Sequence, residues 1–217
     1  MPPRAVPNLS DPGRFRALWR RCLVDGARDD SAAIHQRLLA GYNEQQRFYH
    51  TLKHIEHCIS MFDECSSLVE NPDALELAIW FHDAIYEPGE SDNEARSAQL
   101  YLQLSDGVHA NAIRAQVERL IMATLHLGCS LEDGDASYMV DIDLSSFGLP
   151  WDEFLRDSQN LRREASHLDD AEYHRNARAF HHNLRSRERF FHTDFFAERF
   201  EARAHRNIER YIERFEI

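Results

Sequence analysis

The segment from Asn71 to Tyr86 constrains the fold most, because it is apolar on nearly every side. If it is helical, its Leu, Ile, Ala, Trp and Phe side chains leave no face for solvent. A helix of this kind belongs in the middle of a core, with other elements packed around it. Asn followed by Pro is typical of a helix start, so the segment predicts a central helix from residue 71 to residue 86.

The rest of the chain also has the spacing of helices. Only 8 glycines and 7 prolines occur in 217 residues, and no stretch alternates like a half-buried strand. The sequence therefore predicts an all-α fold, a multi-helix bundle. Besides the central helix, we expect helices over about 10–24, 31–42, 49–66, 91–104, 110–127, 135–147, 151–167, 170–189 and 194–215.

Length favours one domain over residues 1–217. Its chemical motifs lie at about 49–147, and the helices over 151–215 are expected to pack on this part. The alternative is a division near residues 148–150 into two helical lobes. The phenylalanines between 190 and 200 have helical spacing, so they are interpreted as core or homodimer contacts and not as a surface that stacks bases.

Composition narrows the class of partner. A formal net charge of −12 argues against an extended nucleic-acid surface, which depends on clustered Lys and Arg. No apolar run approaches the ~20 residues that span a bilayer, so no membrane segment is expected. Residues 1–8 contain three prolines and no apolar secretory segment, and the four cysteines form no C-x-x-C pair. These features predict a cytoplasmic protein with reduced thiols, and a small anionic substrate stays compatible if a metal supplies positive charge.

The strongest chemical signal is the pair His82-Asp83 inside the apolar segment. An ionised carboxylate there costs several kcal/mol unless it is paired or bound to a metal. For an isolated pair, a capping Asp beside a satisfied core His is the common alternative. His50 and His54, however, are four residues apart, which on a helix places both on one face, where they could converge on the same site.

Two further carboxylates, Asp141 and Asp143, lie in the helix predicted over 135–147. Helical geometry places Asp143 on the apolar face of Met139 and Phe147, so we expect Asp143 to point inward and Asp141 to point elsewhere. An acidic residue at the centre of an apolar face is typical of a ligand.

The order H…HD…D resembles the HD-domain superfamily of metal-dependent phosphohydrolases. The string Trp-Phe-His-Asp-Ala-Ile-Tyr, followed by Asp-Asn-Glu-Ala-Arg-Ser-Ala and later Ile-Asp-Leu-Ser, is similar to a bacterial family of predicted HD phosphohydrolases. The resemblance implies an HD-domain-like helical bundle. It also implies a divalent metal held by four residues: His54, His82, Asp83 and Asp143.

Tyr-His-x-x-x-His is similar to the cyclic-nucleotide phosphodiesterase branch, where the first histidine protonates the leaving oxygen. This likeness makes His50 the candidate general acid, and His50 and Asp83 the candidate catalytic residues. In this sequence Ala84, Ile85 and Tyr86 follow the His-Asp pair in place of further acidic and histidine residues. A cyclic-nucleotide substrate is therefore not implied.

The expected activity is hydrolysis of a phosphoester in a small phosphorylated metabolite or nucleotide. A mixed nitrogen and oxygen ligand set suits Mn, Fe, Zn, Co, Ni or Mg. Such an ion lowers the pKa of bound water from about 15.7 toward ~7, so metal-bound hydroxide is the expected nucleophile. The alternatives are a di-iron oxygenase of the HD type, which requires a second ion, and a non-catalytic sensor of metal or nucleotide.

Several polar residues near the motifs have open roles. Four of them follow the His-Asp pair and could contact the ligands or the substrate, or could simply form a solvent-facing helix start: Glu87, Asn93, Glu94 and Arg96. His126 could bind a second ion or the substrate, or be a satisfied histidine at a helix end. His109 is interpreted as a surface residue.

Overall fold

The computed structural model describes residues 8–125, 134–186 and 188–215, and every regular element within these ranges is helical. The predicted all-α class is therefore confirmed for the described residues. In that part of the chain, no helix is both long and apolar enough to cross a membrane. The helices, in chain order, are α1 (Gly13–Arg21), α2 (Ser31–Tyr42), α3 (Leu52–Cys65), α4 (Pro72–Phe81), α5 (Asn93–Leu104), α6 (Asn111–Ala123), α7 (Gly134–Leu144), α8 (Trp151–Glu164), α9 (Asp170–Ser186) and α10 (Asp194–Phe215), with short 3-10 helices η1 (Ser66–Leu68) and η2 (Ser145–Gly148).

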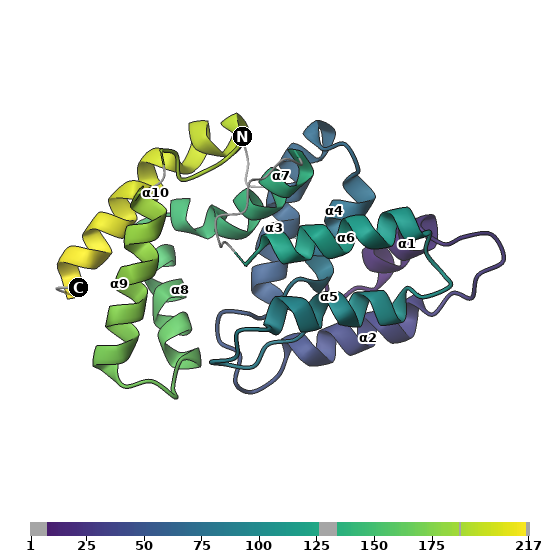
Figure 1. The fold of residues 1–217 in the computed structure, drawn as a ribbon, viewed down its shortest axis with the longest axis horizontal. Coiled ribbons are helices and arrows are strands. Elements are labelled where there is room, and N and C mark those ends of the chain that lie inside the picture. The colour runs from purple at the N-terminus through teal and green to yellow at the C-terminus, as the bar shows by residue number, and fades with distance from the viewer. Residues whose placement is uncertain (1–7, 126–133, 187, 216–217) are drawn as a thin grey trace.

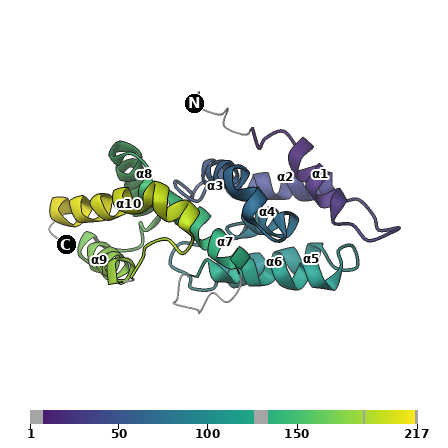
Figure 2. The same ribbon diagram turned by 90° about the horizontal axis from the view of Figure 1, so that it is seen from above.

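The helices form an elongated arrangement. In Figures 1 and 2, α1 to α6 lie toward one end, α8 to α10 gather at the other, and α7 lies between them. The predicted bounds of α2 and α10 agree with the structure, and α5 begins within two residues of its predicted start. The predicted C-terminal part of the helix over 135–147 is the 3-10 helix η2.

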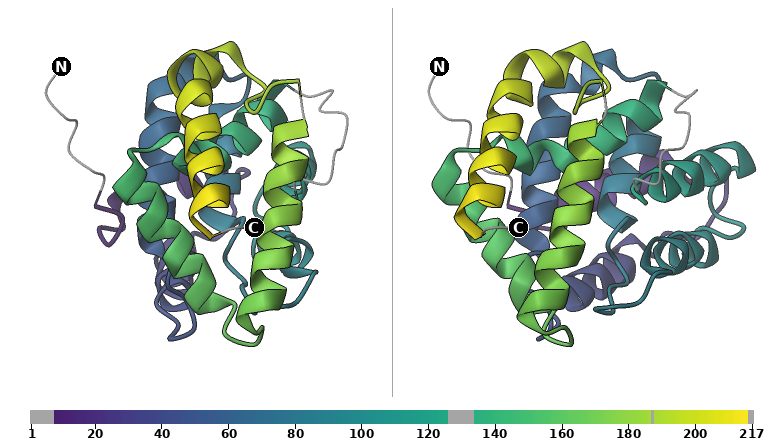
Figure 3. Two further views of the ribbon diagram at one scale, coloured as in Figure 1. Left: turned by 90° about the vertical axis from the view of Figure 1, so that its left-hand side faces the viewer. Right: turned by 60° about the vertical axis from the view of Figure 1, so that its left-hand side comes forward.

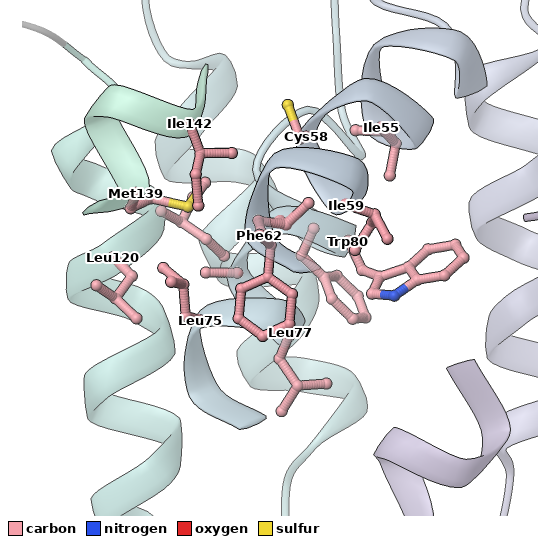
Figure 4. Packing of buried hydrophobic residues seen from close by; sticks show 14 of the residues in the cluster. Ile55, Cys58, Ile59, Phe62, Leu75, Leu77, Trp80, Leu120, Met139 and Ile142 are labelled. Carbon is pink, nitrogen blue, oxygen red and sulfur yellow. The ribbon is translucent and has the colours of Figure 1, made fainter. Parts of the chain in front are cut away.

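Helix α4 lies at the centre of the core, as predicted. Its residues from Ala74 to Phe81 are all buried, and it packs against α1, α3, α5, α6 and α7. Ile59 and Phe62 of α3 and Met139 of α7 belong to the same buried cluster (Figure 4). The absence of a polar face on α4 is therefore explained by neighbours on several sides.

The predicted end of α4 at Tyr86 is wrong, because the helix ends at Phe81. The carbonyl oxygens of Asp83 and Ala84 accept hydrogen bonds from the buried guanidinium of Arg47. These long-range bonds replace the helical ones that would otherwise continue the segment. The His-Asp pair thus lies in a turn at the end of the helix and not inside it.

The predicted start of α3 at Tyr49 is also wrong, since the helix begins three residues later. The backbone N–H groups of residues 48–50 all donate to one carboxylate oxygen of Glu164. They are committed to a contact with α8 instead of a first helical turn. His50 therefore precedes the helix that carries His54, and the two do not share a helix face.

The C-terminal helices α8, α9 and α10 lie next to one another (Figure 3). Helices α8 and α10 contact η2, and the ring of Phe180 in α9 lies 6.2 Å from that of Phe147 in η2, measured between centroids. The side chain of Asn207 donates to the carbonyl oxygens of Phe147 and Leu149, at 2.8 Å each. Phe190 and Phe196 are fully buried in the main apolar cluster, which confirms their interpretation as core residues. That the whole chain is a single domain stays a prediction.

Candidate metal centre

Four of the predicted site residues meet where α3, α4 and α7 adjoin. His54 lies on α3, His82 and Asp83 follow α4, and Asp143 lies in the last turn of α7. The Nε2 atom of His54 is 3.2 Å from Nε2 of His82 and 3.0 Å from Oδ1 of Asp143. Oδ2 of Asp83 is 3.1 Å from His82 Nε2 and 3.6 Å from His54 Nε2. Side chains from three separate elements thus share one small volume.

These spacings fit the ligands of a single cation. The donor atoms of His54, His82 and Asp143 all lie within 4.8 Å of one another, so this cluster could hold a metal ion. Around an ion with bonds of about 2.1 Å, adjacent ligand atoms lie about 3.0 Å apart in an octahedron and about 3.4 Å apart in a tetrahedron. The three separations within this group are 3.0, 3.2 and 3.6 Å.

The ring of His82 is held in the orientation that a metal ligand needs. Its Nδ1 lies 3.0 Å from the carbonyl oxygen of Ile79, which can only accept a hydrogen bond. Nδ1 therefore carries the proton and donates it. Nε2 is therefore the nitrogen directed toward the cluster, where a cation would take the place of its second proton, as in histidine ligands whose other nitrogen is bonded to the protein.

Electrostatics also favour a cation at this position. Burial opposes the charged form of His82, but the carboxylates of Asp83 and Asp143 outweigh it and hold the pKa of His82 well above 6.5. Burial likewise opposes ionisation of Asp83, but His82, His50 and His54 outweigh it and hold the pKa of Asp83 well below 3.8. The Asp83 carboxylate thus remains ionised, and it attracts positive charge to the cluster.

A buried arginine fixes the turn after α4. The Arg47 guanidinium donates to the carbonyl oxygens of Asp83 at 2.6 Å, of Ala84 at 3.2 Å and of His50 at 3.0 Å. The Arg47 side chain is fully buried, and its charge is paired with the more exposed carboxylate of Glu44 at 3.1 Å. Arg47 thereby joins the turn of the His-Asp pair to the segment that precedes α3.

Glu164, at the end of α8, holds His50 in place. One carboxylate oxygen accepts the three backbone N–H groups of residues 48–50, and the other lies 2.7 Å from His50 Nδ1. Burial opposes the charged form of His50, but Asp83 and Glu164 outweigh it and raise the pKa of His50 above 6.5. The ring of Tyr86 stacks on a face of the imidazole, 4.1 Å away between ring centroids. His50 is therefore fixed through Nδ1, and its Nε2 is free of this contact.

His57 connects α3 to the end of α7. Its Nε2 lies 2.7 Å from Oγ of Ser145, and that hydroxyl donates its hydrogen to the carbonyl oxygen of Ile142. Because the hydroxyl has one hydrogen, His57 Nε2 must be the donor to it. Burial lowers the pKa of His57 to about 4, so its ring is neutral near pH 7.

Asp141 takes no part in the cluster, although it is more buried than Asp143. Its carboxylate accepts hydrogen bonds from the backbone N–H groups of His192 and Thr193 and from the Thr193 hydroxyl, at 2.7 to 2.8 Å. Burial raises the pKa of Asp141 to about 6 in spite of these bonds. The expectation that only Asp143 points inward is wrong, because both carboxylates are inward and they meet different partners.

The polar residues after the His-Asp pair mainly bind their own loop. The Asn93 side chain accepts from the backbone N–H of Glu87 and donates to the carbonyl oxygens of Glu87 and Glu90. Arg96 pairs with Asp92 at 3.8 Å. For Asn93 and Arg96 the structure therefore favours the helix-start interpretation. Glu94, the fourth candidate, lies half-buried in the first turn of α5.

The two other candidate histidines have different outcomes. His126 lies outside the described residues. His109 is 3% exposed, so its interpretation as a surface residue is wrong. Its Nδ1 is hydrogen-bonded to the hydroxyl of Tyr101 at 3.1 Å, and its ring packs against the Trp19 ring with 4.1 Å between the centroids. These contacts indicate a packing role for His109.

Three residues that contact the candidate site or its supporting segments are not predicted from the sequence. Arg47, His57 and Glu164 all contact the site or the segments that carry it. Glu164 lies 114 residues from His50, in a charged helix end that looks like ordinary solvent-facing surface. His57 had a weak signal, since it lies one helical turn from His54 on the same helix.

Comparisons of the chain with protein-family models, with curated proteins and with solved structures found no match.

Proposed function

We propose that this chain is a metal-dependent phosphohydrolase that cleaves the phosphoester bond of a small phosphorylated metabolite or nucleotide. The proposal rests above all on the cluster of His54, His82 and Asp143, whose donor atoms surround a space suited to one cation. Asp83, 3.1 Å from His82, is the fourth ligand in this proposal. The resemblance of H…HD…D to the HD-domain superfamily supports it.

A divalent ion bound here would polarise a phosphoryl oxygen and lower the pKa of water. The mixed nitrogen and oxygen donors suit Mn, Fe, Zn, Co, Ni or Mg. The side chains of Asp83 and Asp143 are each 15% exposed, whereas those of His54 and His82 are almost completely buried. Access to the proposed cation site is therefore limited and lies on the side of the carboxylates.

His50 is the proposed general acid. Its Nδ1 is bonded to Glu164, so the protonated ring carries its second proton at Nε2 for the leaving oxygen. The side chain is 19% exposed, which allows contact with a substrate. A positioned acid of this kind contributes about 10²- to 10⁴-fold to a rate.

The test is hydrolysis of a panel of phosphomonoesters and nucleotides by protein loaded with each divalent ion in turn. We expect Asp83→Ala and Asp143→Ala to bind less metal and to lose at least ~100-fold in kcat/KM. His50→Ala should keep its metal and lose ~10²- to 10⁴-fold in kcat. The matched control is Asp106→Ala, because the Asp106 side chain is 77% exposed.

If Asp83→Ala keeps both its metal and the wild-type rate, the proposal is wrong. Bound metal without turnover of any phosphoester would instead indicate a non-catalytic sensor. Two irons in each chain, with oxygen-dependent turnover, would indicate an oxygenase.

A further inference from the structure

A pocket of about 330 Å³ lies among η2, α8, α9 and α10, beside the candidate metal centre. Two rings on its wall touch the site residues. The ring of Tyr49 lies 4.9 Å from that of His54, and the ring of Tyr86 lies 4.1 Å from that of His50, measured between centroids. The volume falls in the range of small-molecule sites, about 300–1,000 Å³. The pocket thus begins where the proposed chemistry takes place.

Aromatic side chains dominate the wall of this pocket. Seven of its fourteen lining residues are Tyr or Phe, and these include Phe147, Phe154 and Tyr173. Such rings favour flat apolar groups, which they contact by stacking or edge to face. Of the other seven lining residues, three are apolar: Leu161, Ala165 and Ala177. The two serine hydroxyls are already bonded, that of Ser146 to the Tyr49 hydroxyl and that of Ser158 to the Phe154 carbonyl oxygen, so neither is a ready partner for a polyhydroxylated group.

The charge of the pocket also restricts its occupant. None of the described lining residues is Lys or Arg, and the one carboxylate is Asp157, whose side chain is 18% exposed. Additional phosphates are normally bound by Arg or Lys, or by a metal. A triphosphate chain extending into this pocket would meet a carboxylate and aromatic faces without a positive partner.

We propose that this pocket binds the leaving group of the substrate, and that this group is uncharged and aromatic. The substrate class is then a monoester that carries a single phosphate on an aromatic or aromatic-bearing group, with the phosphate at the metal centre and the ring over Tyr49 and Tyr86. This inference rests on the proposed function, because it takes the metal centre as the place of the phosphate.

Ala177 and Ala179 of α9 provide a matched pair of variants. Ala177 is half-buried and lines the pocket, whereas Ala179 is exposed and does not line it. Ala177→Trp should fill part of the pocket, and Ala179→Trp adds the same side chain outside it. Phe180→Ala is a second variant that removes an aromatic wall and leaves the core intact, because Phe180 is 40% exposed.

The test uses the full chain loaded with Mn. Calorimetry, which needs no turnover, measures the binding of 1-naphthyl phosphate and of glycerol 3-phosphate. A separate assay measures kcat/KM for 1-naphthyl phosphate and acetyl phosphate. We expect 1-naphthyl phosphate to bind at least ~10-fold more tightly than glycerol 3-phosphate, a difference of ~1.4 kcal/mol. Ala177→Trp and Phe180→Ala should each remove most of this preference, whereas Ala179→Trp should keep it. Ala179→Trp should also leave kcat/KM for acetyl phosphate, whose leaving group is too small to fill the pocket, at the wild-type value.

Equal binding of the two phosphates by the wild type, or an unchanged preference in both pocket variants, overturns the inference even if phosphoesters are hydrolysed. The expected pattern of binding without any turnover would support the pocket assignment and contradict the proposed hydrolase.

Discussion

The bonding partners of each buried carboxylate, and not its depth of burial, distinguish Asp141 from Asp143. Asp141 and Asp143 lie on one helix two residues apart, yet Asp141 binds backbone N–H groups of the chain before α10 and Asp143 faces two histidines. A carboxylate that accepts N–H groups is satisfied by the protein itself. Asp143 instead faces imidazole nitrogens, in a cluster that could hold a metal ion.

Glu164→Gln is expected to change the pH dependence of the proposed reaction. Glu164 helps to hold the pKa of His50 above 6.5, so the protonated acid persists to higher pH than an ordinary histidine. Loss of the negative charge lowers that pKa, and the alkaline side of the kcat/KM profile should move to lower pH. A glutamine also presents an N–H donor to Nδ1, which disfavours the tautomer now fixed there.

The measurement is a pH profile of kcat/KM for both proteins, with metal content as the control. A purely structural role for Glu164 predicts a lower rate with an unmoved profile. Such a result would contradict the positioning of His50 by this carboxylate.

The ends of the helices, more than their middles, build the candidate site. The motif residues lie before α3, after α4 and in the last turn of α7, where backbone groups are not all paired within a helix. Arg47 and Glu164 satisfy these groups with side chains. The junction of η2 with α10 shows how closely such ends are packed, since a Cβ at Gly148 would lie 2.5 Å from Cβ of Phe200.

Gly148→Ala is expected to destabilise the protein by ~1–3 kcal/mol, because the added methyl would push against the backbone end of Phe200 and force α10 to shift. Gly134→Ala is the matched control, since a Cβ there meets nothing within 4 Å. This variant should be neutral or slightly stabilising, as Ala is a better helix former than Gly. Urea unfolding measures the free energy of unfolding of both variants. Equal values for Gly148→Ala and Gly134→Ala would contradict the close packing of α10 on η2.

At the scale of the whole molecule, the cluster ties together elements that are distant in sequence. His54 and Asp143 are separated by 89 residues, and their side chains meet at 3.0 Å. An ion held by both, and by the turn after α4, would cross-link α3, α4 and α7 in the folded state only. Metal binding should therefore add to the stability of the fold.

Removal of metal by a chelator is expected to lower the melting temperature. At a free ion concentration 100 times Kd, the linked stabilisation is ~2.7 kcal/mol. For a chain of this size that corresponds to roughly 5–10 °C. Thermal unfolding with Mn and with a chelator measures the shift in the wild type and in Asp143→Ala. An equal shift in the variant would show that the ion binds elsewhere.

The sequence by itself determined the helical class, the central place of α4 and the identity of the clustered residues. Apolar periodicity and a His-Asp pair within an apolar segment are local signals of burial and of its electrostatic cost. Only the tertiary structure decided where α3 begins and α4 ends, that Asp141 is also buried and binds the chain before α10, and which glutamate holds His50. These features depend on bonds across up to 114 residues, as between His50 and Glu164. A glutamate in such a charged helix end has the same local pattern whether it faces solvent or accepts buried N–H groups, so no local pattern could distinguish the two.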